Sequence, residues 1–437
     1  MNRLRILVLA PDCNPDSICG PLISYSQAEA LARLHDVTLA VRSPYEDAVR
    51  RQQAPFQALE VVRLPWLERI YAWSLRHIFQ NNYNNQALTA FGYPFAIAFE
   101  WAVWRRMRNR IAYGQFDAVL RLMPITAVLP SPFAFFLRKG PIPFVVGPIN
   151  GGLPFLPGFT QADNQKQWIS GLRKLYRFLP FARSTYCDAA AIMAGSSQTY
   201  AEFATYRDKL FFLPENGVSR SLCSTSRRSP APGAKLELIF IGSLIPFKAC
   251  DLALRAAASV LRGGLARFTV IGDGSERERL QKLAKDLGIE NSVSFCGFLS
   301  HAETMQRLRM ADIMVFPSVR EFGGAVVFEA LATGTVPIVA DFGGPGDIVR
   351  PEFGYKVILT NEADVVSQME RILVSLAADR NLLEHLRVKG MSYAQERLTW
   401  DAKARILTQI VCWVKGLGPK PDLPPPKALE IGAASSE

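Results

Sequence analysis

The sequence of 437 residues is poor in the features that mark metal-bound, disulfide-rich or secreted proteins. Its seven cysteines are scattered and odd in number, and none form a Cys-x-x-Cys pair. This argues against a zinc site or a disulfide framework and favours a reducing compartment. The apolar run at residues 4–10 is too short for a signal peptide and Asp12 follows at once, so we expect a buried strand there. No internal repeat of solenoid period is present.

The composition describes a folded protein of more than one domain. Apolar residues make up 49% and charged residues 20% of the chain, which excludes a disordered protein, and the length favours two domains. Residues 1–220 hold 24 basic and 15 acidic residues, a net charge of +9 out of +11 for the chain. This excess suits an anionic surface or acceptor in the N-terminal half, although a mildly basic soluble domain explains it equally well.

Predicted strands and helices alternate in both halves of the chain. The strands are expected at residues 4–10, 37–41, 59–64, 118–122, 144–149, 190–194 and 210–213, and then from residue 236 and at 268–271, 293–295, 313–316, 336–340 and 355–358. The clearest helices of the N-terminal half are expected at 24–34 and 198–206. This alternation predicts two Rossmann-like, doubly wound α/β domains with parallel sheets, which bind their ligand in a cleft at the carboxyl ends of the strands.

Breaks in composition divide the chain. Residues 219–234, which contain Ser-Thr-Ser-Arg-Arg-Ser-Pro-Ala-Pro-Gly, form the best candidate linker. We therefore expect an N-terminal domain at 1–218 and a C-terminal domain at 235–391. Residues 416–437 are rich in proline and small residues, and we expect them to be disordered.

The most informative segment runs from Glu321 to Ala330. Two carboxylates, Glu321 and Glu329, are separated by seven residues and bracket Gly323 and Gly324, which lie at a predicted strand-to-helix turn. Free backbone N–H groups and the helix dipole favour an anion at such a turn. A carboxylate at each end of a phosphate site suits a nucleotide sugar, whose two ends both carry hydroxyl groups.

This segment resembles the Glu-x7-Glu signature of retaining glycosyltransferases of family 4, which have the two-domain GT-B fold. Three further segments resemble the family in the right order: 241–244 with Lys248 four residues on, 271–276, and 295–298. The resemblance covers roughly residues 236–350. It implies that the domain at 1–218 binds the acceptor, that the domain at 235–391 binds the nucleotide sugar, and that a helix at 392–415 crosses back to the N-terminal domain. The enzyme would transfer a sugar from a nucleotide-diphosphate sugar to a hydroxyl group.

The resemblance also implies residue roles. Lys248 would neutralise the leaving diphosphate, Glu321 would contact the donor sugar and stabilise positive charge at its anomeric carbon, and Glu329 would accept hydrogen bonds from the ribose. The other donor-binding candidates are Gly242, Ser243, Gly272, Gly274, Gly297, Phe298, Ser318, Gly323 and Gly324. The family usually has an arginine at the position of Ser243, so one cation on the diphosphate is missing here. The loop Gly343-Gly344-Pro345-Gly346 either faces the cleft or forms a plain turn.

The acceptor side is less explicit. Gly20 ends a loop that resembles the glycine loop of the family, and Asn150, Gly151 and Gly152 follow a strand and either line the cleft or form a structural turn. Arg121 stands where many members have a histidine. Without a convincing histidine base, the resemblance implies that the departing diphosphate oxygen accepts the acceptor proton. It also implies no cofactor and no metal.

Residues 66–110 combine many aromatic side chains with arginines. The nearly apolar stretch 87–104 is interrupted by Gly92, Pro94 and Glu100, which disfavours a membrane-spanning helix. The segment is typical either of contact with an anionic membrane surface or of helices that pack on the N-terminal sheet with solvated arginines.

We therefore expect a glycosyltransferase of polysaccharide or glycolipid biosynthesis. It would be cytoplasmic or peripheral on the inner face of the plasma membrane. Its partners would be a UDP-, GDP- or ADP-linked sugar and a saccharide or lipid-linked acceptor, and not a nucleic acid. The alternative, motivated by Ser243 and the missing histidine, is a degenerate GT-B protein that binds a nucleotide sugar or a partner without catalysis. A GT-B epimerase would require different carboxylates and histidines.

Overall fold

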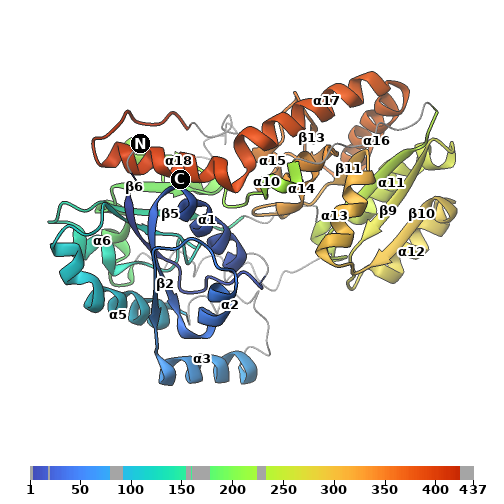
Figure 1. Ribbon diagram of the computed structural model, residues 1–437. Coiled ribbons are helices and arrows are strands. Elements are labelled where there is room, and N and C mark those ends of the chain that lie inside the picture. The colour runs from blue at the N-terminus through green and yellow to red at the C-terminus, as the bar shows by residue number, and fades with distance from the viewer. Residues whose placement is uncertain are drawn as a thin grey trace, which may run out of the picture. The chain divides into compact units, whose positions relative to one another are not determined.

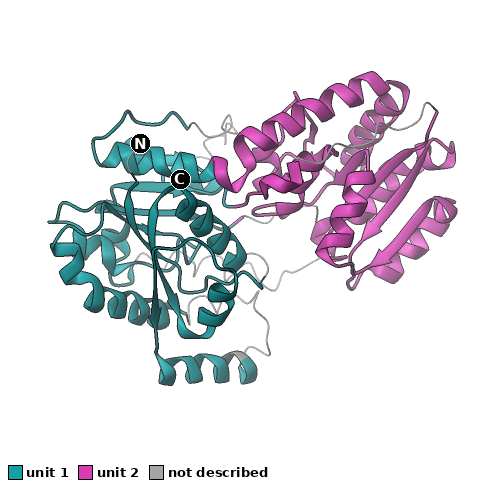
Figure 2. Cartoon of the chain, viewed as in Figure 1, with its two compact units in different colours: residues 1–152, 165–215, 403–437 teal, residues 153–164, 216–402 magenta. Residues whose placement is uncertain are grey.

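The computed structural model describes residues 3–17, 20–78, 92–153, 159, 178–223 and 233–423 (Figure 1). The chain divides into two compact units (Figure 2). Unit 1 contains Met1–Gly152, Gln165–Glu215 and Lys403–Glu437, and unit 2 contains Leu153–Asn164 and Asn216–Ala402. Part of the aromatic segment (79–91), most of the predicted linker (224–232) and most of the predicted tail (424–437) lie outside the described residues.

Unit 1 is built on a parallel sheet of seven strands in the order β3-β2-β1-β4-β5-β6-β7. The strands are β1 (Arg5–Leu9), β2 (Asp36–Arg42), β3 (Ala58–Val62), β4 (Ala118–Arg121), β5 (Phe144–Ile149), β6 (Ala191–Ala194) and β7 (Leu210–Phe212). The helices are α1 (Gly20–Leu34), α2 (Glu46–Arg51), α3 (Pro65–His77), α5 (Tyr93–Ala112), α6 (Pro132–Leu137), α8 (Ala182–Cys187) and α9 (Ser197–Glu202), with 3₁₀ turns at Ser43–Tyr45 and Ala204–Lys209. All seven predicted strands of this half are present.

Unit 2 is built on a parallel sheet of six strands in the order β10-β9-β8-β11-β12-β13. The strands are β8 (Leu236–Ile241), β9 (Ala266–Ile271), β10 (Val293–Gly297), β11 (Ile313–Phe316), β12 (Val336–Ala340) and β13 (Tyr355–Val357). The helices are α10 (Arg220–Cys223), α11 (Cys250–Arg262), α12 (Arg277–Asp286), α13 (His301–Met310), α14 (Ala325–Thr333), α15 (Gly343–Ile348), α16 (Glu362–Ala378) and α17 (Arg380–Tyr393), with 3₁₀ turns at Pro246–Lys248 and Glu290–Ser292.

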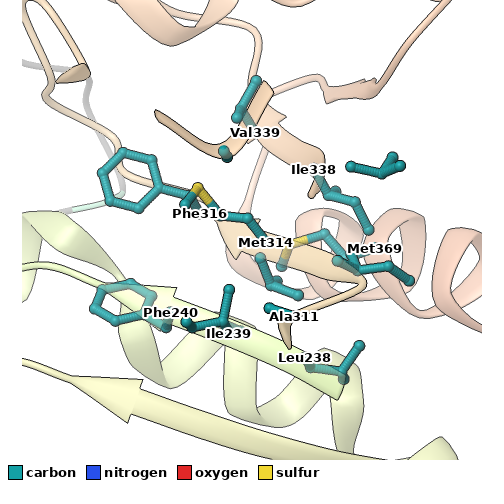
Figure 3. Packing of buried hydrophobic residues seen from close by; sticks show 14 of the residues in the cluster. Leu238, Ile239, Phe240, Ala311, Met314, Phe316, Ile338, Val339 and Met369 are labelled. Atoms are coloured by element: carbon teal, nitrogen blue, oxygen red, sulfur yellow. The ribbon is translucent and has the colours of Figure 1, made fainter. Parts of the chain in front are cut away.

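The central strands of unit 2 form because their side chains are apolar on both faces, as in other parallel sheets covered by helices. Figure 3 shows Ile239 and Phe240 of β8 beside Met314 and Phe316 of β11, with Met369 of α16 packed near them. All five side chains are at most 1% exposed. Each such burial contributes roughly 1.5–3 kcal/mol, so this core holds the strand ends that carry the candidate site.

Three predicted elements differ from the structure. The predicted linker begins with α10, because Leu222 is buried in the core of unit 2. The helix expected at 198–206 ends at Glu202 and continues as a 3₁₀ turn. The helix expected at 392–415 is two elements, since a π-helical turn at Ala394–Leu398 separates α17 from α18 (Trp400–Val414). None of the described helices is both long and apolar enough to cross a bilayer.

Candidate functional site

The candidate site lies where the strand order of unit 2 changes direction. β8 and β11 are neighbours in the sheet, with Ile313 paired to Leu238, and the chain leaves them toward opposite edges. Ligands of doubly wound sheets bind at such a point, outside the carboxyl ends of the strands. The loop after β8 carries Lys248, and the loop after β11 carries Glu321.

Lys248 and Glu321 form an ion pair between these two loops. Their side chains are 17% and 19% exposed, so the pair is mostly removed from water. Glu321 Oε1 accepts a hydrogen bond from the Gly324 N–H at 3.3 Å, and Lys248 Nζ lies 5.5 Å from the centre of the Phe316 ring. The sequence predicted that both residues contact the sugar donor, but it did not predict that they pair with each other. The arrangement holds a cation and a carboxylate side by side.

Backbone contacts tie the two loops together. The Phe247 carbonyl accepts hydrogen bonds from the Val319 N–H at 3.0 Å and from Ser318 Oγ at 3.3 Å. Ser318, a predicted donor residue, is buried. These contacts fix the distance between the loop of Lys248 and the loop of Glu321 before any ligand binds.

The glycine loop after β12 packs on the loop that carries Glu321. The Gly344 N–H donates to the Glu321 carbonyl at 3.1 Å. A Cβ on Gly343 would overlap the Glu321 carbonyl oxygen, and a Cβ on Gly344 would overlap that of Phe322. Gly343 also has a φ of +62°, which other residues rarely adopt. This loop is therefore more than a plain turn, because its missing side chains allow the close approach.

Glu329, on α14, contacts a histidine that the sequence reasoning missed. Its Oε1 lies 2.9 Å from Nε2 of His301, the first residue of α13. The hydrogen bond to Glu329 raises the pKa of His301 above its ordinary value, although the histidine side chain is 75% exposed. A sequence signal existed: Ser300 and Glu303 form a capping box, which places His301 at a helix start directly after β10.

The predicted glycines after β9 and β10 bring further loops to the same edge. Gly272 has a φ of +127°, and a Cβ there would overlap the Gly242 carbonyl oxygen. Its N–H donates to the Gly297 carbonyl at 2.9 Å. A Cβ on Gly274 would in the same way overlap the carbonyl oxygen of Leu244. The loops after β8, β9 and β10 are thus packed backbone to backbone.

The remaining donor candidates lie on these loops. Ser243 is exposed after β8, Gly323 lies beside Gly324 before α14, and the Phe298 ring is 78% exposed. No side chain of these residues is in contact with Lys248 or Glu321 through a hydrogen bond or an ion pair within the described part of the chain. They can contribute to a ligand site through exposed surface and backbone groups.

In unit 1 the acceptor candidates gather at the ends of β1, β4 and β5. Gly20 begins α1, and a Cβ there would lie 3.4 Å from Ile125 Cδ1. Asn150 pairs with Thr126, and its Nδ2 donates to Glu215 Oε2. The residues after Asn150 are held as well, because the Gly151 N–H donates to Thr199 Oγ1 at 2.7 Å. Gly152 follows in irregular backbone.

A buried polar cluster surrounds Glu215, the hydrogen-bond acceptor of Asn150. The Glu215 carbonyl accepts a hydrogen bond from Gln27 Nε2 at 2.9 Å, and Lys403 Nζ donates to the Pro214 carbonyl. Burial lowers the pKa of Lys403 to about 7, which the charge of Glu215 partly opposes. The sequence reasoning missed this cluster, since its members are separated by up to 376 positions in the chain.

Arg121 has a different environment from the one that the sequence suggested. Its side chain is fully buried, its Nε donates to Glu100 Oε1 at 2.6 Å, and its Nη2 donates to the Leu129 carbonyl at 2.8 Å. Ser131 Oγ donates to the other oxygen of Glu100. Burial raises the pKa of Glu100, and Arg121 acts in the opposite direction. This placement favours a structural role for Arg121 over contact with an acceptor.

Within the described ranges, no group of three or more histidine, cysteine, aspartate or glutamate side chains is arranged to hold a metal ion. The charged candidates on the loops after β8, β10 and β11 form two pairs, Lys248 with Glu321 and His301 with Glu329.

Comparison with known proteins agrees with this geometry. Residues 224–388 match the family model of the glycosyl transferases group 1. The matched region contains Lys248, Glu321 and Glu329, as well as His301. The matched region lies entirely within unit 2.

Curated relatives align over a similar part of the chain. An uncharacterised glycosyltransferase of Methanocaldococcus jannaschii is 30% identical over 170 residues, which cover 38% of this chain and 42% of the relative. A D-inositol 3-phosphate glycosyltransferase of Thermomonospora curvata is 32% identical over 220 residues, which cover 48% of this chain and 50% of the relative. The chain thus spans half the length or less of these relatives.

Solved structures match nearly the whole chain. Anabaena Alr3699/HepE, crystallised in complex with UDP, matches with a TM-score of 0.61 at 14% identity and covers 94% of this chain and 100% of that one. Sucrose-phosphate synthase from Thermosynechococcus elongatus matches with a TM-score of 0.60 at 17% identity and covers 95% and 100%. At such identities the likeness concerns the fold. Together with the two parallel sheets, it confirms the predicted two-domain GT-B fold.

Proposed function

We propose that this protein is a retaining glycosyltransferase that transfers a sugar from a nucleotide-diphosphate sugar to a hydroxyl group of a saccharide or lipid-linked acceptor. The observation that carries the proposal is the Lys248–Glu321 pair at the switch point of the unit 2 sheet. Without a donor the two charges neutralise each other. A donor offers a better partner to each, a diphosphate to the lysine and sugar hydroxyl groups to the carboxylate.

Lys248 is proposed to stabilise the leaving group. Negative charge accumulates on the diphosphate as the bond between its oxygen and the anomeric carbon breaks, and a fixed ammonium stabilises this charge in the transition state. The loop contacts through Phe247 hold Lys248 near Glu321 before the donor binds. With Ser243 in place of a second cation, Lys248 would carry most of this stabilisation.

Glu321 is proposed to stabilise the positive charge that develops at the anomeric carbon. The acceptor oxygen forms its new bond to this carbon on the face that the diphosphate leaves, which retains the configuration. The acceptor proton passes to the departing diphosphate oxygen, so the step balances without a histidine base. Glu329 would accept hydrogen bonds from the ribose, while His301 holds one of its oxygens.

We propose UDP as the first nucleotide to test, because three structures of the similar Anabaena protein contain UDP or UDP-glucose. We place the reaction in the cytoplasm, at the inner face of the plasma membrane, in polysaccharide or glycolipid assembly. Lys248 supplies a positive charge for the diphosphate, so we propose that transfer requires neither a cofactor nor a divalent cation.

A thermal-shift panel tests the donor site. The purified full chain is heated with UDP, GDP, ADP and their sugars, each with magnesium and with EDTA. A nucleotide at about 100 times its Kd stabilises the fold by roughly 2.7 kcal/mol. We expect one diphosphate to raise the Tm equally with magnesium and EDTA, and Lys248→Met to abolish the shift.

The active donor is then incubated with the protein, and release of free sugar and nucleotide is measured. Slow hydrolysis supports an enzyme over a degenerate binding protein. A Tm shift without hydrolysis or transfer to any acceptor would favour the binding protein. No shift with any nucleotide would contradict the assignment of this site.

A further inference from the structure

Helix α3 (Pro65–His77) presents large apolar side chains to solvent. Trp66 is 63% exposed, Ile70 is 44% exposed and Trp73 is 57% exposed. Their spacings of four and three residues place them on one stripe, within an arc of about 60° at 100° per residue. Surface helices of globular proteins normally turn such a stripe inward.

The other side of α3 is anchored to unit 1, so the stripe cannot turn inward by a simple rotation. Leu67 and Ser74 are buried. The Tyr71 ring contacts the Phe95 ring of α5, with centroids 5.0 Å apart, and the Arg42 guanidinium lies 5.7 Å from the Tyr71 centroid. Leu67, Tyr71 and Ser74 are also spaced by four and three residues, and form the inner stripe of the helix.

The outward side of α3 is positively charged. Arg69 and Arg76 are exposed and lie next to the tryptophan stripe. The only acidic residue of the helix, Glu68, is partly buried and accepts a hydrogen bond from Ser43 Oγ at 3.0 Å. Residues 1–220, which include this helix, carry the net charge of +9.

We propose that the outer face of α3, formed by Trp66, Arg69, Ile70, Trp73 and Arg76, binds the surface of an anionic lipid bilayer. Tryptophan indoles settle at the boundary between headgroups and acyl chains, and arginines beside them are attracted to anionic headgroups. The helix would lie flat on the bilayer, with its inner stripe still packed on unit 1. This binding requires neither a nucleotide sugar nor an acceptor, so it stands independently of the proposed catalysis.

The size of the face favours a bilayer over a protein partner. Thirteen helical residues span about 20 Å, so a face about 10 Å wide offers roughly 200 Å². A stable protein interface buries about 800 Å² per partner. A bilayer needs no matching surface beyond the helix, because two indoles and two guanidinium groups can enter its interface directly.

Flotation with vesicles tests the proposal. The full chain is mixed with vesicles of phosphatidylcholine alone, or with vesicles in which about a third of the lipid is anionic phosphatidylglycerol. Each mixture is prepared in about 0.1 M and about 0.5 M NaCl, because the higher salt concentration screens charges more strongly. We expect binding to the anionic vesicles that weakens in high salt, and little binding to the neutral ones. The variant R69Q/R76Q should lose about thirtyfold in affinity for anionic vesicles.

The variant W66S/W73S should lose at least about tenfold, since it removes the side chains that enter the interface. A matched control is W101S/R108Q on α5, which removes another exposed tryptophan and another exposed arginine of the same unit. This control should bind as the wild type does. The Tm of each variant verifies that it is folded.

Three outcomes would overturn the proposal. The first is that the wild type does not bind anionic vesicles. The second is that the α5 control W101S/R108Q loses as much affinity for these vesicles as the α3 variants do, and the third is that W66S/W73S binds them as the wild type does. A concentration-dependent dimer that W66S/W73S abolishes, without vesicle binding, would assign the face to a second copy of the chain instead. Donor hydrolysis is measured in parallel, and we expect it to be unchanged in the α3 variants, so failure of membrane binding and failure of catalysis are separable.

Discussion

Replacing Lys248 by methionine or Glu321 by glutamine is expected to remove most of the transfer activity while the protein stays folded. Lys248→Met keeps an unbranched apolar side chain and removes the ammonium, whose nitrogen lies 5.5 Å from the centre of the Phe316 ring. Glu321→Gln keeps an oxygen that can accept the Gly324 N–H and removes only the charge. Both changes are nearly isosteric, so their effects report on charge.

The magnitudes separate the effect on catalysis from that on stability. Loss of one preorganised group that stabilises transition-state charge lowers turnover by roughly 10²–10³-fold, or about 2.7–4 kcal/mol. Loss of one partner costs about 0–1 kcal/mol for an exposed ion pair and about 3–5 kcal/mol for a buried one. With side chains 17% and 19% exposed, we expect an intermediate loss of about 2 kcal/mol. A stability of about 5–15 kcal/mol tolerates this loss.

The assay is release of nucleoside diphosphate from the donor identified by thermal shift, with kcat measured for each variant and Tm as the check on folding. The double variant should lose less stability than the two single variants together, because each single change leaves an unpaired charge. Lys415→Met is the matched control: Lys415 Nζ lies 3.6 Å from Asp117 Oδ1, with side chains 26% and 18% exposed. Turnover within threefold of wild type in both single variants, or an equal loss of turnover in Lys415→Met, would contradict the roles assigned to Lys248 and Glu321.

Three further changes test other parts of the two units. His301→Ala should raise the KM for the donor about threefold, a modest effect because the His301 side chain is 75% exposed, although that of Glu329 is only 21% exposed. The raised pKa of His301 means that the charged pair is present at low pH and lost as the pH rises through that pKa. Gly344→Ala should lower kcat/KM at least about tenfold and reduce the Tm, because the new Cβ overlaps the Phe322 carbonyl. In the wild type the free energy of unfolding should rise between pH 7 and pH 10 by on the order of 3 kcal/mol, because the unfolded chain binds a proton on Lys403 that the folded chain lacks in this window. Lys403→Met should abolish this rise, which urea titrations at several pH values measure.

Each of these changes has a control and a contradicting result. His301→Gln keeps a hydrogen bond and should remove the pH dependence of donor KM; a persisting dependence would assign it to another group. Gly140→Ala introduces a Cβ that meets only the Leu137 carbonyl at 3.5 Å, and it should be silent where Gly344→Ala is not. An unchanged pH slope in Lys403→Met would show that this lysine stays charged in the folded chain.

The sheets could be predicted from the sequence because their strands are locally determined. In a parallel sheet covered on both faces, a strand appears as a short apolar run between breaking residues, and β5, β11 and β12 have the predicted bounds. α10 could not be found in this way. It has only four residues in a stretch rich in serine and arginine, and the burial of Leu222 depends on tertiary packing.

The same distinction explains which parts of the site could be predicted. Glu321 and Glu329 lie on one short loop and helix, so their spacing alone indicated that they act together. Their partners Lys248 and His301 lie on the loop after β8 and at the start of α13, at separations of 73 and 28 residues, and only the strand order brings them near. Arg121 is the opposite case: its position in the chain suggested a ligand contact, whereas its side chain is buried and pairs with Glu100.

The acceptor site should be sought at the switch point of the other sheet. In unit 1 the strand order changes direction between β1 and β4, and Gly20 after β1 packs near Ile125 after β4. Asn150 after β5 pairs with Thr126 in the same loop. An acceptor that binds between these loops therefore meets backbone groups and the Asn150 amide, which donates to Glu215. Selection of the acceptor would then depend on loop shape, which short motifs do not encode, and this explains why the sequence indicates the donor chemistry more clearly than the acceptor.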